Sequence, residues 1–518
     1  MKKHIYLYGP SGSGKSTVGA MLANDLDMQF VDLDARITEA ADKDIPTIMD
    51  VQGEPHFRDL ETEELRRLAD EEPSVVSLGG GALVRKENRQ FAEETGDIVF
   101  LDADIDVLID RLKTDEEKRP LLDGNLGQSL GGLLEKRKEH YLSFEQRINA
   151  NGELPETVKE IKLSLGRFRL KAMGGGYDLR IQEGIRHELG DHLRVLGLRR
   201  PVLLVSDENV MPLYGDAAVH SLEAAGYQTE KLSLPAGESH KTIQTVSSIW
   251  EAALAAGLER TSTIIALGGG VVSDLAGFAA ATYMRGCNWV AVPTTVLAMV
   301  DASLGGKTGC DLPQGKNLAG AFYPPKAVLT DPHVLSTLPE REMLAGLAEV
   351  VKHGIISDPE LFAMVSEGMD SIQNDLKNIL CRGIAVKAEI IEEDPYEKGV
   401  RAALNYGHTI GHAVEALSGY SLLHGEAVSI GMAAEARISE KLGISDEGLA
   451  EEIIAVLRGL GLPTAIPAEM NSTELVKQMR TDKKKSGGIV RFALPERIGK
   501  VVTGVEIGEI ENILEETR

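Results

Sequence analysis

Hydrophobic positions follow one pattern in the first two thirds of the chain and another in the last third. Up to about residue 338, short apolar runs alternate with longer, charged stretches of helical character. The runs lie at Ile5–Tyr8, Val75–Leu78, Ile98–Leu101, Val202–Ser206, Thr263–Leu267, Val290–Pro293 and Ala327–Leu329. Short apolar runs between helical stretches are typical of buried strands in parallel sheets. The pattern therefore predicts two consecutive α/β segments, each built on a parallel sheet.

The last third has apolar positions at helical spacing instead. They recur in 338–356, 371–393, 402–418, 424–442 and 446–461, which predicts an all-helical domain. A break between the two α/β segments is expected at 153–168, where Glu153-Leu154-Pro155-Glu156 precedes a polar helix. We therefore expect three domains, at residues 1–162, 168–337 and 338–518.

Charge and composition narrow the possible partners. The 518 residues carry a formal net charge of −25, and aromatic residues make up only 4%. Such a chain is a poor binder of nucleic acid or anionic membrane, and it has no apolar run of the length that a membrane span needs. Its three cysteines, Cys287, Cys310 and Cys381, lack CxxC spacing, which favours reduced thiols in a cytoplasmic protein. An anionic small molecule must then be bound by a local basic pocket.

The first glycine-rich motif directly follows the first predicted strand. Its sequence, Gly9-Pro10-Ser11-Gly12-Ser13-Gly14-Lys15-Ser16, matches the phosphate-binding pattern GxxxxGK[ST]. Backbone N–H groups of such a loop meet a helix N-terminus and suit nucleotide phosphates, while the lysine reaches the phosphates and the serine holds Mg²⁺. We therefore expect an ATP site at Gly12, Ser13, Gly14, Lys15, Ser16 and Thr17.

Further polar residues of this segment indicate a small hydroxylated, acidic acceptor. Asp32 and Asp34 end a second apolar stretch, so one carboxylate can serve Mg²⁺ through water and the other can take a hydroxyl. Cations and a glycine turn follow at Phe57-Arg58, Gly79-Gly80-Gly81, Arg119-Pro120-Leu121-Leu122 and Arg137 with Tyr141. In this order, the motifs resemble those of shikimate kinase.

The resemblance implies a P-loop kinase domain with a parallel sheet, which transfers a phosphoryl group from ATP to the 3-hydroxyl of shikimate with Mg²⁺. Ser16 and Asp32 would serve Mg²⁺, and Arg119 would be a lid arginine that contacts ATP. Asp34 would be catalytic, because it would orient or deprotonate the attacking hydroxyl. Arginine pairs suit the shikimate carboxylate. Shikimate would be bound by Asp34, Arg58, Gly79, Gly80, Gly81 and Arg137.

The rest of the chain carries a second glycine-rich turn and a set of metal-ligating residue types. Leu267-Gly268-Gly269-Gly270-Val271-Val272-Ser273-Asp274 follows a predicted strand and precedes a helix, as a pyrophosphate-binding turn does, although GxGxxG is absent. A carboxylate with imidazoles and open coordination positions suits a catalytic Zn²⁺. Spacing alone leaves open which three residues bind the metal among Glu349, His353, His408, His412 and His424.

Cationic residues form a third group, some of them in glycine-flanked loops, at Arg285, Lys307, Lys316, Lys352, Lys387 and Arg401. Taken with the other motifs, they resemble 3-dehydroquinate synthase. The matching segments are Pro235-Ala236-Gly237-Glu238, Leu267–Gly277, Pro293-Thr294-Thr295, Asp301–Thr308, Gly315-Lys316-Asn317, Ala348–His353, Arg401–His412 and His424-Gly425-Glu426.

This second resemblance implies a Rossmann-like α/β domain followed by an all-helical metal-binding domain. The metal, Zn²⁺ or Co²⁺, would be held by Glu349, His408 and His424. NAD would be held by Glu238, Lys241, Gly269, Gly270, Asp274, Thr294, Thr295, Lys307 and Lys316. The substrate pocket would contain Arg285, Asp301, Lys307, Lys316, Asn317, Lys352, Lys387, Arg401, Asn405, His412 and Lys483. Of these, Lys307, Lys352, Lys387, Arg401, Asn405 and His412 would be catalytic.

The implied reaction converts 3-deoxy-D-arabino-heptulosonate 7-phosphate to 3-dehydroquinate and phosphate, with NAD regenerated and no net redox change. Arg285 would reach the substrate phosphate of the neighbouring subunit, which implies a homodimer. Two positions depart from the family pattern, Met299 where Gln is usual and Ala302 where Ser is usual. We expect them to repack the surroundings of Asp301.

Two alternatives stay open on the sequence. One is a metal- and NAD-dependent polyol dehydrogenase on the same scaffold, fused to another small-molecule kinase. Such an enzyme would not need the phosphate-binding cations. The other is a binding module in which one half has lost its chemistry, although Lys15, Asp34, Glu349, His408 and His424 are all present.

Overall fold

The computed structural model describes residues 3–113, 126–483 and 490–516, with the side chains of 481–483 also left out. The chain forms two compact units, Met1–Arg169 and Leu170–Arg518. Two expected site residues are therefore not placed, since Arg119 and the side chain of Lys483 lie outside the described residues.

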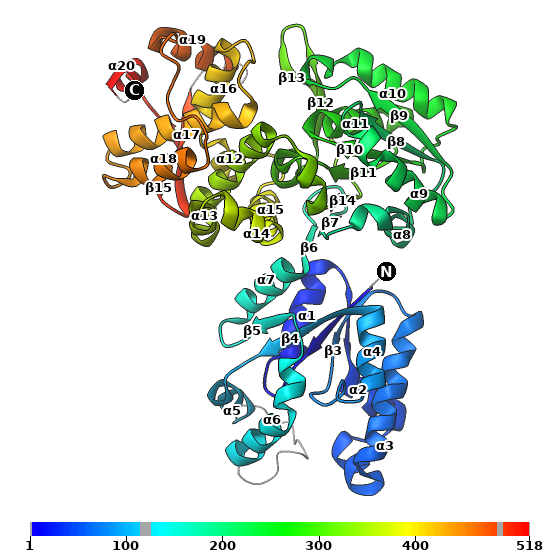
Figure 1. The fold of residues 1–518 in the computed structure, drawn as a ribbon. Helices are drawn as coiled ribbons and strands as arrows, with labels where there is room; N and C mark the ends of the chain where they lie inside the picture. The colour runs from blue at the N-terminus through cyan, green and yellow to red at the C-terminus, as the bar shows by residue number, and fades with distance from the viewer. Residues whose placement is uncertain (1–2, 114–125, 484–489, 517–518) are drawn as a thin grey trace. The chain divides into compact units, whose positions relative to one another are not determined.

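The first unit is built on a parallel five-stranded sheet with helices on both faces (Figure 1). The strand order is β2 (Gln29–Asp32), β3 (Ser74–Ser77), β1 (His4–Tyr8), β4 (Gly96–Asp102) and β5 (Arg147–Asn149). Its helices are α1 (Lys15–Leu26), α2 (Leu33–Ala41), α3 (Ile45–Arg67), α4 (Lys86–Thr95), α5 (Ile105–Lys113), α6 (Leu126–Leu142) and α7 (Leu154–Leu165).

Alternation along β1 explains why this sheet has a core on each face. Tyr6 and Tyr8 belong to one buried cluster, and Ile5 and Leu7 belong to another, because successive side chains of a strand point to opposite faces. The strands predicted at Ile5–Tyr8, Val75–Leu78 and Ile98–Leu101 are confirmed within a residue or two. The carboxyl ends of β1, β2 and β3 lie side by side, with Asp32 paired to Ser77 and Leu7 paired to Ser77.

The second unit begins with a parallel sheet whose strands lie in the order β7 (Tyr177–Ile181), β14 (Ala327–Thr330), β11 (Asn288–Pro293), β10 (Thr263–Gly268), β8 (Val202–Asp207) and β9 (Thr229–Leu234). The short strand β6 (Arg167–Leu170) spans the junction between the units. The connecting helices are α8 (Leu189–Val195), α9 (Asp216–Ala224), α10 (Ile243–Ala255) and α11 (Gly270–Thr282). An antiparallel hairpin of β12 (Lys307–Leu312) and β13 (Gly315–Phe322) precedes β14. The sequence pattern had not predicted this hairpin.

The rest of the second unit is mainly helical, as predicted (Figure 1). Its helices are α12 (Glu340–Ser357), α13 (Pro359–Ser366), α14 (Met369–Asn374), α15 (Leu376–Glu393), α16 (His408–Leu417), α17 (His424–Lys441), α18 (Leu449–Gly459), α19 (Ser472–Lys483) and α20 (Ile510–Glu516). A 3₁₀ helix, Val400–Asn405, precedes α16. None of the helices in the described ranges has both the length and the apolar character needed to cross a bilayer.

One hairpin interrupts the helices and corrects the expectation of an all-helical region. Strands β15 (Arg491–Arg497) and β16 (Lys500–Glu506) pair antiparallel. Phe492 and Leu494 are buried in the same cluster as Ile410 and Val414 of α16. Their alternating pattern is only a few residues long and ends at Pro495, so it resembled a polar loop in the sequence.

Candidate active sites

The phosphate-binding loop of the first unit has the conformation that its sequence predicts. It connects the buried end of β1 to α1, and Gly14, at the start of α1, has a φ of 88° that favours glycine. The Lys15 ammonium donates to the carbonyls of Gly9, at 3.0 Å, and Pro10, at 2.8 Å. The loop N–H groups at the helix start make this a site for nucleotide phosphates.

The expected magnesium residues lie together at the neighbouring strand ends. The Ser16 hydroxyl donates to Oδ2 of Asp32 at 2.7 Å and lies 3.2 Å from Oγ of Ser77. Oδ1 of Asp32 accepts from the backbone N–H groups of Asp34 and Ala35, which fixes the carboxylate at the start of α2. A carboxylate with hydroxyl oxygens is the ligand type that Mg²⁺ prefers. Ser77 was not predicted, because it is an ordinary residue at the end of an apolar run.

Two carboxylates converge where the glycine turn begins. A Cβ atom at Gly79 would lie 2.9 Å from Oε1 of Glu61 and 3.0 Å from Oδ1 of Asp34. Glu61 is fully buried and is in ion-pair contact with Arg58. Burial outweighs this contact and raises the pKa of Glu61 to about 7. Sequence reasoning missed Glu61. Its only signal was the i, i+3 spacing from Arg58 in a helix rich in charge.

The other predicted acceptor residues border the same turn. The Gly80 carbonyl accepts from Nη1 of Arg137 and from the Tyr141 hydroxyl, both at 2.8 Å, and from the Tyr8 hydroxyl at 3.1 Å. A Cβ atom at Gly81 would lie 2.6 Å from Nη2 of Arg58. Arg58 and Arg137 therefore both face the glycine turn, where only glycine leaves space. Two guanidinium groups beside exposed backbone suit a carboxylate ligand.

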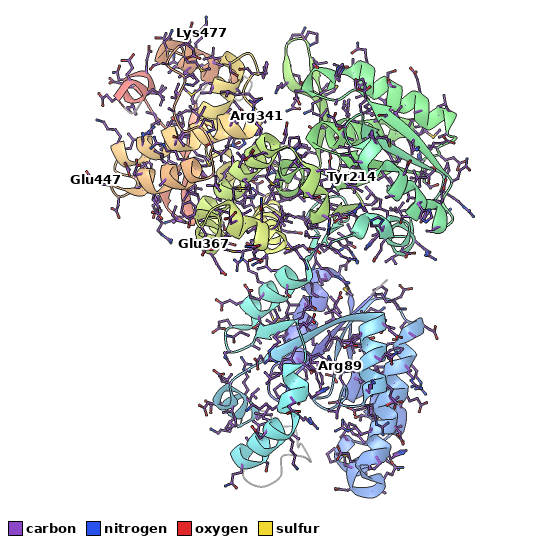
Figure 2. The ribbon with its side chains drawn as sticks, viewed as in Figure 1. Arg89, Tyr214, Arg341, Glu367, Glu447 and Lys477 are labelled. Carbon is purple, nitrogen blue, oxygen red and sulfur yellow. The ribbon has the colours of Figure 1, made fainter. Side chains whose placement is uncertain are left out.

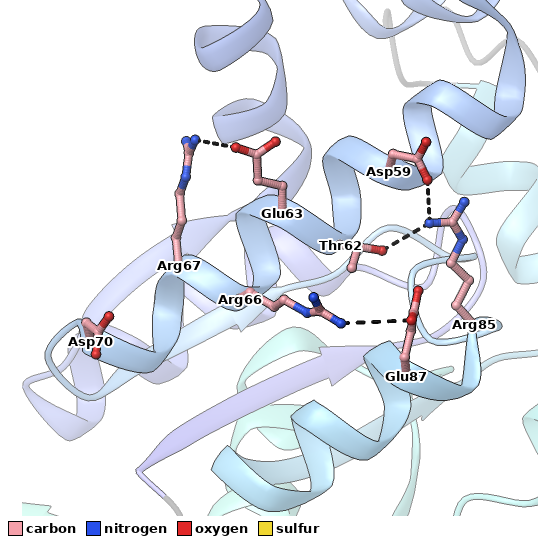
Figure 3. A pocket seen from close by; sticks show the side chains of 8 residues that line it. All are labelled: Asp59, Thr62, Glu63, Arg66, Arg67, Asp70, Arg85 and Glu87. Carbon is pink, nitrogen blue, oxygen red and sulfur yellow. Dashed lines mark hydrogen bonds and ion pairs between the residues drawn. The ribbon is translucent and has the colours of Figure 1, made fainter.

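A surface pocket beside this turn contains Asp59, Thr62, Glu63, Arg66, Arg67, Asp70, Arg85 and Glu87 (Figure 3). Its three arginines face four carboxylates, so it is not an anion site. Arg85 Nη1 donates to the carbonyl of Arg58 at 3.0 Å and to Oδ1 of Asp59 at 2.8 Å. Arg85 follows the glycine turn in the chain. Its two hydrogen bonds therefore connect the segment after that turn to the part of α3 that carries Arg58. Sequence reasoning missed this role.

In the second unit, three helices bring the expected metal ligands together. Glu349 lies on α12, and His408 and His424 begin α16 and α17. Oε1 of Glu349 is 3.5 Å from Nε2 of His408 and 3.4 Å from Nε2 of His424. The rings of His408 and His424 are 5.3 Å apart between centroids. Residues that are far apart in the sequence thus form one cluster.

Glycines allow these helices to approach closely enough. A Cβ atom at Gly425 would lie 1.8 Å from the carbonyl oxygen of Ala345, and one at Gly431 would lie 1.9 Å from that of Gly407. Backbone therefore packs against backbone between α12 and α17 and between α16 and α17. The ligand side chains at the helix starts are brought within reach of one another by these contacts.

The electrostatics of this cluster fit a divalent metal. Glu349 is fully buried, and neither carboxylate oxygen has a hydrogen-bond partner among the described residues, although Lys352 is in ion-pair contact with it. Burial alone would raise the pKa of Glu349, but Lys352 and the two histidines hold it well below its usual range. Burial also keeps the pKa of His408 well below its usual range. An ionised carboxylate beside a neutral imidazole is a ready ligand set for Zn²⁺ or Co²⁺.

The remaining two candidates differ in their surroundings. His412 is exposed, and its ring lies 5.2 Å from that of His408 and 5.7 Å from that of His424. His353 is fully buried near Asp301 and Glu349, and burial lowers its pKa to about 3. His412 groups with His408 and His424, while His353 groups with Asp301 and Glu349. Glu349 borders both groups, because its Oε1 also lies near Nε2 of His408 and of His424. The set of Glu349, His408 and His424 stays a prediction.

The second glycine-rich turn lies where β10 leads into α11. Thr295 lies beside Gly269, and Thr294 donates its backbone N–H to the Gly268 carbonyl at 3.0 Å. Asp274, on α11, pairs with Lys241 at 2.6 Å. Burial raises the pKa of Asp274 to about 6 despite this contact. The turn offers N–H groups at a helix start next to paired charges, as a dinucleotide site does.

The hairpin β12–β13 adds charged residues to the same site. Nζ of Lys241 donates to Oδ1 of Asn317 at 2.6 Å. Nζ of Lys316 is 2.8 Å from Oε1 of Glu415 and 3.5 Å from Oε1 of Glu238. The expected cofactor residues on α11, on the segment before α10 and on β13 therefore form one network.

Three further cations expected in the substrate pocket each have an oxygen partner within the second unit. Nζ of Lys387 donates to Oδ1 of Asp301 at 2.5 Å and to its carbonyl at 2.6 Å, and burial lowers the pKa of Lys387 to about 8. Arg401 is buried and donates to the carbonyl of Pro395 at 2.6 Å. Lys307 is half-exposed and pairs with Glu397 at 2.7 Å.

Some expected residues are less closely tied to the cluster. Arg285 is exposed on the turn between α11 and β11, with a left-handed φ of 67°. Asn405 is half-buried at the end of the 3₁₀ helix. Of the two departures, Met299 is fully buried, and Ala302 lies beside Gly270 of the glycine turn. Met299 is therefore a core residue two positions before Asp301, and its effect on the surroundings of Asp301 stays a prediction.

The two units match different families of known proteins. A family model described as 3-dehydroquinate synthase N-terminal matches residues 231–345, and one described as 3-dehydroquinate synthase C-terminal matches 346–485. A 3-dehydroquinate synthase from Synechocystis sp. is 46% identical over 332 residues, which cover 63% of this chain and 92% of the relative. The chain belongs to the 3-dehydroquinate synthase family. A shikimate kinase model matches residues 11–165. The chain is thus a shikimate kinase joined to a 3-dehydroquinate synthase.

Solved structures agree with the synthase fold. A 2-epi-5-epi-valiolone synthase from Streptomyces hygroscopicus, with NAD⁺ and Zn²⁺ bound, is 29% identical with a TM-score of 0.61, over 66% of this chain and 95% of its own. A 2-deoxy-scyllo-inosose synthase complexed with carbaglucose-6-phosphate, NAD⁺ and Co²⁺ is 26% identical with a TM-score of 0.62, over 68% of this chain and all of its own. Since the synthase models match both parts of the second unit, the polyol dehydrogenase alternative is set aside.

Proposed function

We propose that Glu349, His408 and His424 hold the divalent metal of the synthase, and that the turn at Gly269 and Gly270 holds NAD⁺. The observation that carries this proposal is the buried Glu349 carboxylate, 3.5 and 3.4 Å from two imidazole nitrogens. When bound, the metal polarises a substrate hydroxyl and NAD⁺ accepts and returns a hydride. The conversion of 3-deoxy-D-arabino-heptulosonate 7-phosphate to 3-dehydroquinate would take place between these sites.

The chain's own cations would bind the two acidic groups of this substrate. Lys307, Lys316, Lys387 and Arg401 are spread around the site and can divide the carboxylate and the phosphate between them. Lys387 is held by the Asp301 carboxylate at 2.5 Å, which fixes one donor in place. His412 is exposed next to His408 and His424, so it can move a proton to or from a substrate bound there.

In the first unit, we propose that Asp34 orients or deprotonates the shikimate hydroxyl while Arg58 and Arg137 bind the shikimate carboxylate. Asp34 lies next to Glu61 and Gly79, and both arginines face the glycine turn. Lys15 and the loop N–H groups would bind the phosphates of ATP, and Ser16 and Asp32 would serve Mg²⁺. Arg119, outside the described residues, would complete the ATP site from the lid.

Metal content tests the synthase proposal. The protein is dialysed against EDTA, and bound zinc is measured after reloading in the wild type and in Glu349→Gln. The wild type should take up one zinc per chain and the variant should retain little, because it keeps the side-chain volume and loses the charge. Glu447→Gln, an exposed change in the same unit (Figure 2), serves as the control. Equal zinc content in the wild type and Glu349→Gln would contradict the assignment.

The oligomeric state and the location are proposed on separate grounds. Arg285 is exposed on its turn, which supports a role in the site of a second subunit in a homodimer. Mixing inactive Arg285→Ala with inactive Lys352→Ala should then restore synthase activity, because mixed dimers carry one intact site. No recovery after subunit exchange would contradict this.

The three buried, unpaired cysteines support a reducing, cytoplasmic location.

A further inference from the structure

Glu415 joins the expected metal site to the expected cofactor site. It lies on α16, and its side chain is only 8% exposed. One carboxylate oxygen, Oε2, is 3.2 Å from Nδ1 of His424, and the other, Oε1, is 2.8 Å from Nζ of Lys316. A single buried carboxylate thus contacts a residue on α17 and a residue on the hairpin β12–β13.

The contact with His424 determines how that ring presents its other nitrogen. The Glu415 carboxylate accepts a hydrogen bond from a protonated Nδ1. In the neutral imidazole that binds a metal, this leaves the lone pair on Nε2, on the side of the ring away from Glu415. Nε2 is the atom that faces Oε1 of Glu349, at 3.4 Å. A carboxylate behind a histidine ligand also makes the imidazole a stronger ligand and fixes its orientation. Glu415 is therefore placed to prepare His424 for metal binding.

The contact with Lys316 extends in the opposite direction. The Lys316 ammonium is also 3.5 Å from Glu238 and lies 4.3 Å from the centroid of the Tyr420 ring. Glu238 in turn lies 4.0 Å from Lys241, which pairs with Asp274 on α11. Charges of alternating sign thus run from His424 through Glu415 and Lys316 to the helix that follows the glycine turn.

Charge balance requires the carboxylate at this point. A divalent ion bound by His424 and the Lys316 ammonium are both positive, and Glu415 lies between them. Without its charge, the two cations would repel each other across a partly buried space. Of the contacts described above, Lys316 would keep those with Glu238 and the Tyr420 ring. Removing the charge of Glu415 should therefore weaken the binding of both the metal and the dinucleotide.

We propose that Glu415 is a positioning residue with two functions, fixing the tautomer of His424 for the metal and holding Lys316 for the dinucleotide. The inference rests on the proposed metal and NAD⁺ sites. It differs from an ordinary support for a metal ligand, because it predicts an effect on dinucleotide binding that passes through Lys316.

The test compares the full-length wild type with Glu415→Gln, Lys316→Met and the double variant. Co²⁺ affinity is measured by competition with a chelating dye, the Co²⁺ coordination by its visible d–d absorption, and NAD⁺ affinity by calorimetry on the Co²⁺-loaded protein. Glu415→Gln should lower Co²⁺ affinity about 10- to 100-fold and change the d–d spectrum. It should also weaken NAD⁺ binding about tenfold, the order of one lost charge-assisted hydrogen bond.

Lys316→Met separates the two functions. This variant should bind NAD⁺ more weakly, while its Co²⁺ spectrum should stay the same as that of the wild type. Adding Glu415→Gln to Lys316→Met should then lower NAD⁺ affinity little further. Glu447→Gln, exposed in the same unit, should match the wild type in every measurement. If Glu415→Gln does not fold, Glu415→Asp provides the test, because its shorter carboxylate cannot reach both partners.

The outcomes distinguish this inference from the proposal on which it rests. A wild type that binds neither Co²⁺ nor NAD⁺ would overturn the proposed sites themselves. A wild type that binds both, with an unchanged Co²⁺ spectrum in Glu415→Gln, would overturn the role of Glu415 at His424. If adding Glu415→Gln to Lys316→Met lowers NAD⁺ affinity by the same factor as Glu415→Gln alone lowers it in the wild type, the connection through Lys316 is overturned.

Discussion

Oε1 of Glu349 lies 3.4 Å from Nε2 of His424, and the two residues reach this distance only because α12 and α17 pack backbone to backbone at Gly425. A side chain at Gly425 would collide with the Ala345 carbonyl oxygen, four residues before Glu349. The geometry of the proposed metal site therefore depends on the absence of a side chain at residue 425 as well as on the proposed ligands.

Gly425→Ala should separate α12 from α17 and weaken the metal site. The added Cβ would lie 1.8 Å from the Ala345 oxygen, so the backbone must move. We expect a loss of unfolding free energy of about 1–3 kcal/mol, typical of overpacking, together with reduced zinc content after reloading. Calorimetric melting and metal analysis measure the two effects. Gly459→Ala on α18, where a Cβ meets nothing within 4 Å, is the matched control and should change neither.

Glu61 should make the stability of the first unit dependent on pH near neutrality. Burial raises its pKa from 4.5 in the unfolded chain to about 7 in the folded one. The folded state thus holds the proton more tightly, so this stabilising contribution is complete below pH 4.5 and is lost as the pH rises through 7. The loss is at most about 3 kcal/mol. Thermal unfolding followed by circular dichroism at pH 5 to 8 should show this slope in the wild type and a flatter one in Glu61→Gln. Parallel profiles would contradict the assignment.

Gly81→Ala should impair shikimate binding and spare ATP. The new methyl group would lie 2.6 Å from the Arg58 guanidinium and push it out of place. We expect the KM for shikimate to rise about tenfold, or about 1.4 kcal/mol, with the KM for ATP unchanged. Steady-state kinase assays give both constants. Gly132→Ala on α6, in open space, should behave like the wild type, and an equal rise in both variants would refute this account.

Arg85→Gln should have a smaller effect of the same kind. Arg85, which follows the glycine turn, donates hydrogen bonds to the Arg58 carbonyl and to Asp59, and so helps to position Arg58. Its loss should raise the KM for shikimate several-fold and leave ATP binding unaffected. Arg66→Gln is the control from the same pocket, because Arg66 forms a long ion pair with Glu87, at 3.8 Å, and both side chains are exposed (Figure 3). Identical kinetics for Arg85→Gln and the wild type would show that the hydrogen bonds of Arg85 do not contribute to shikimate binding.

Local patterns made much of this architecture predictable. The phosphate-binding loop is a contiguous motif, and the strands at Ile5–Tyr8 and Thr263–Leu267 are short apolar runs between helices, so both could be recognised from neighbouring residues. The two histidines of the metal cluster were also found, since each begins a helix within a distinctive motif. Their selection over His412 and His353 came from the resemblance to 3-dehydroquinate synthase and stays a prediction, because spacing does not show which side chains bind the metal.

What the sequence did not reveal depends on contacts between distant segments. Glu61 is one of several glutamates in the charged helix α3, and Glu415 is the one acidic residue of α16. In both cases the partners of the carboxylate become visible only through tertiary packing. The hairpin β12–β13 is rich in glycine and polar residues, so its pattern resembled a loop. Its two strands satisfy each other's backbone hydrogen bonds, and Thr308 and Cys310 of β12 are buried.

The most direct test of the whole account is phosphate release from 3-deoxy-D-arabino-heptulosonate 7-phosphate. The full chain is assayed with NAD⁺ before and after EDTA treatment and after zinc is restored, while absorbance at 340 nm is followed. We predict phosphate release that EDTA abolishes and zinc restores, with no lasting accumulation of NADH, because the hydride returns within the same cycle. No release, or NADH that accumulates as substrate is consumed, would contradict the synthase assignment.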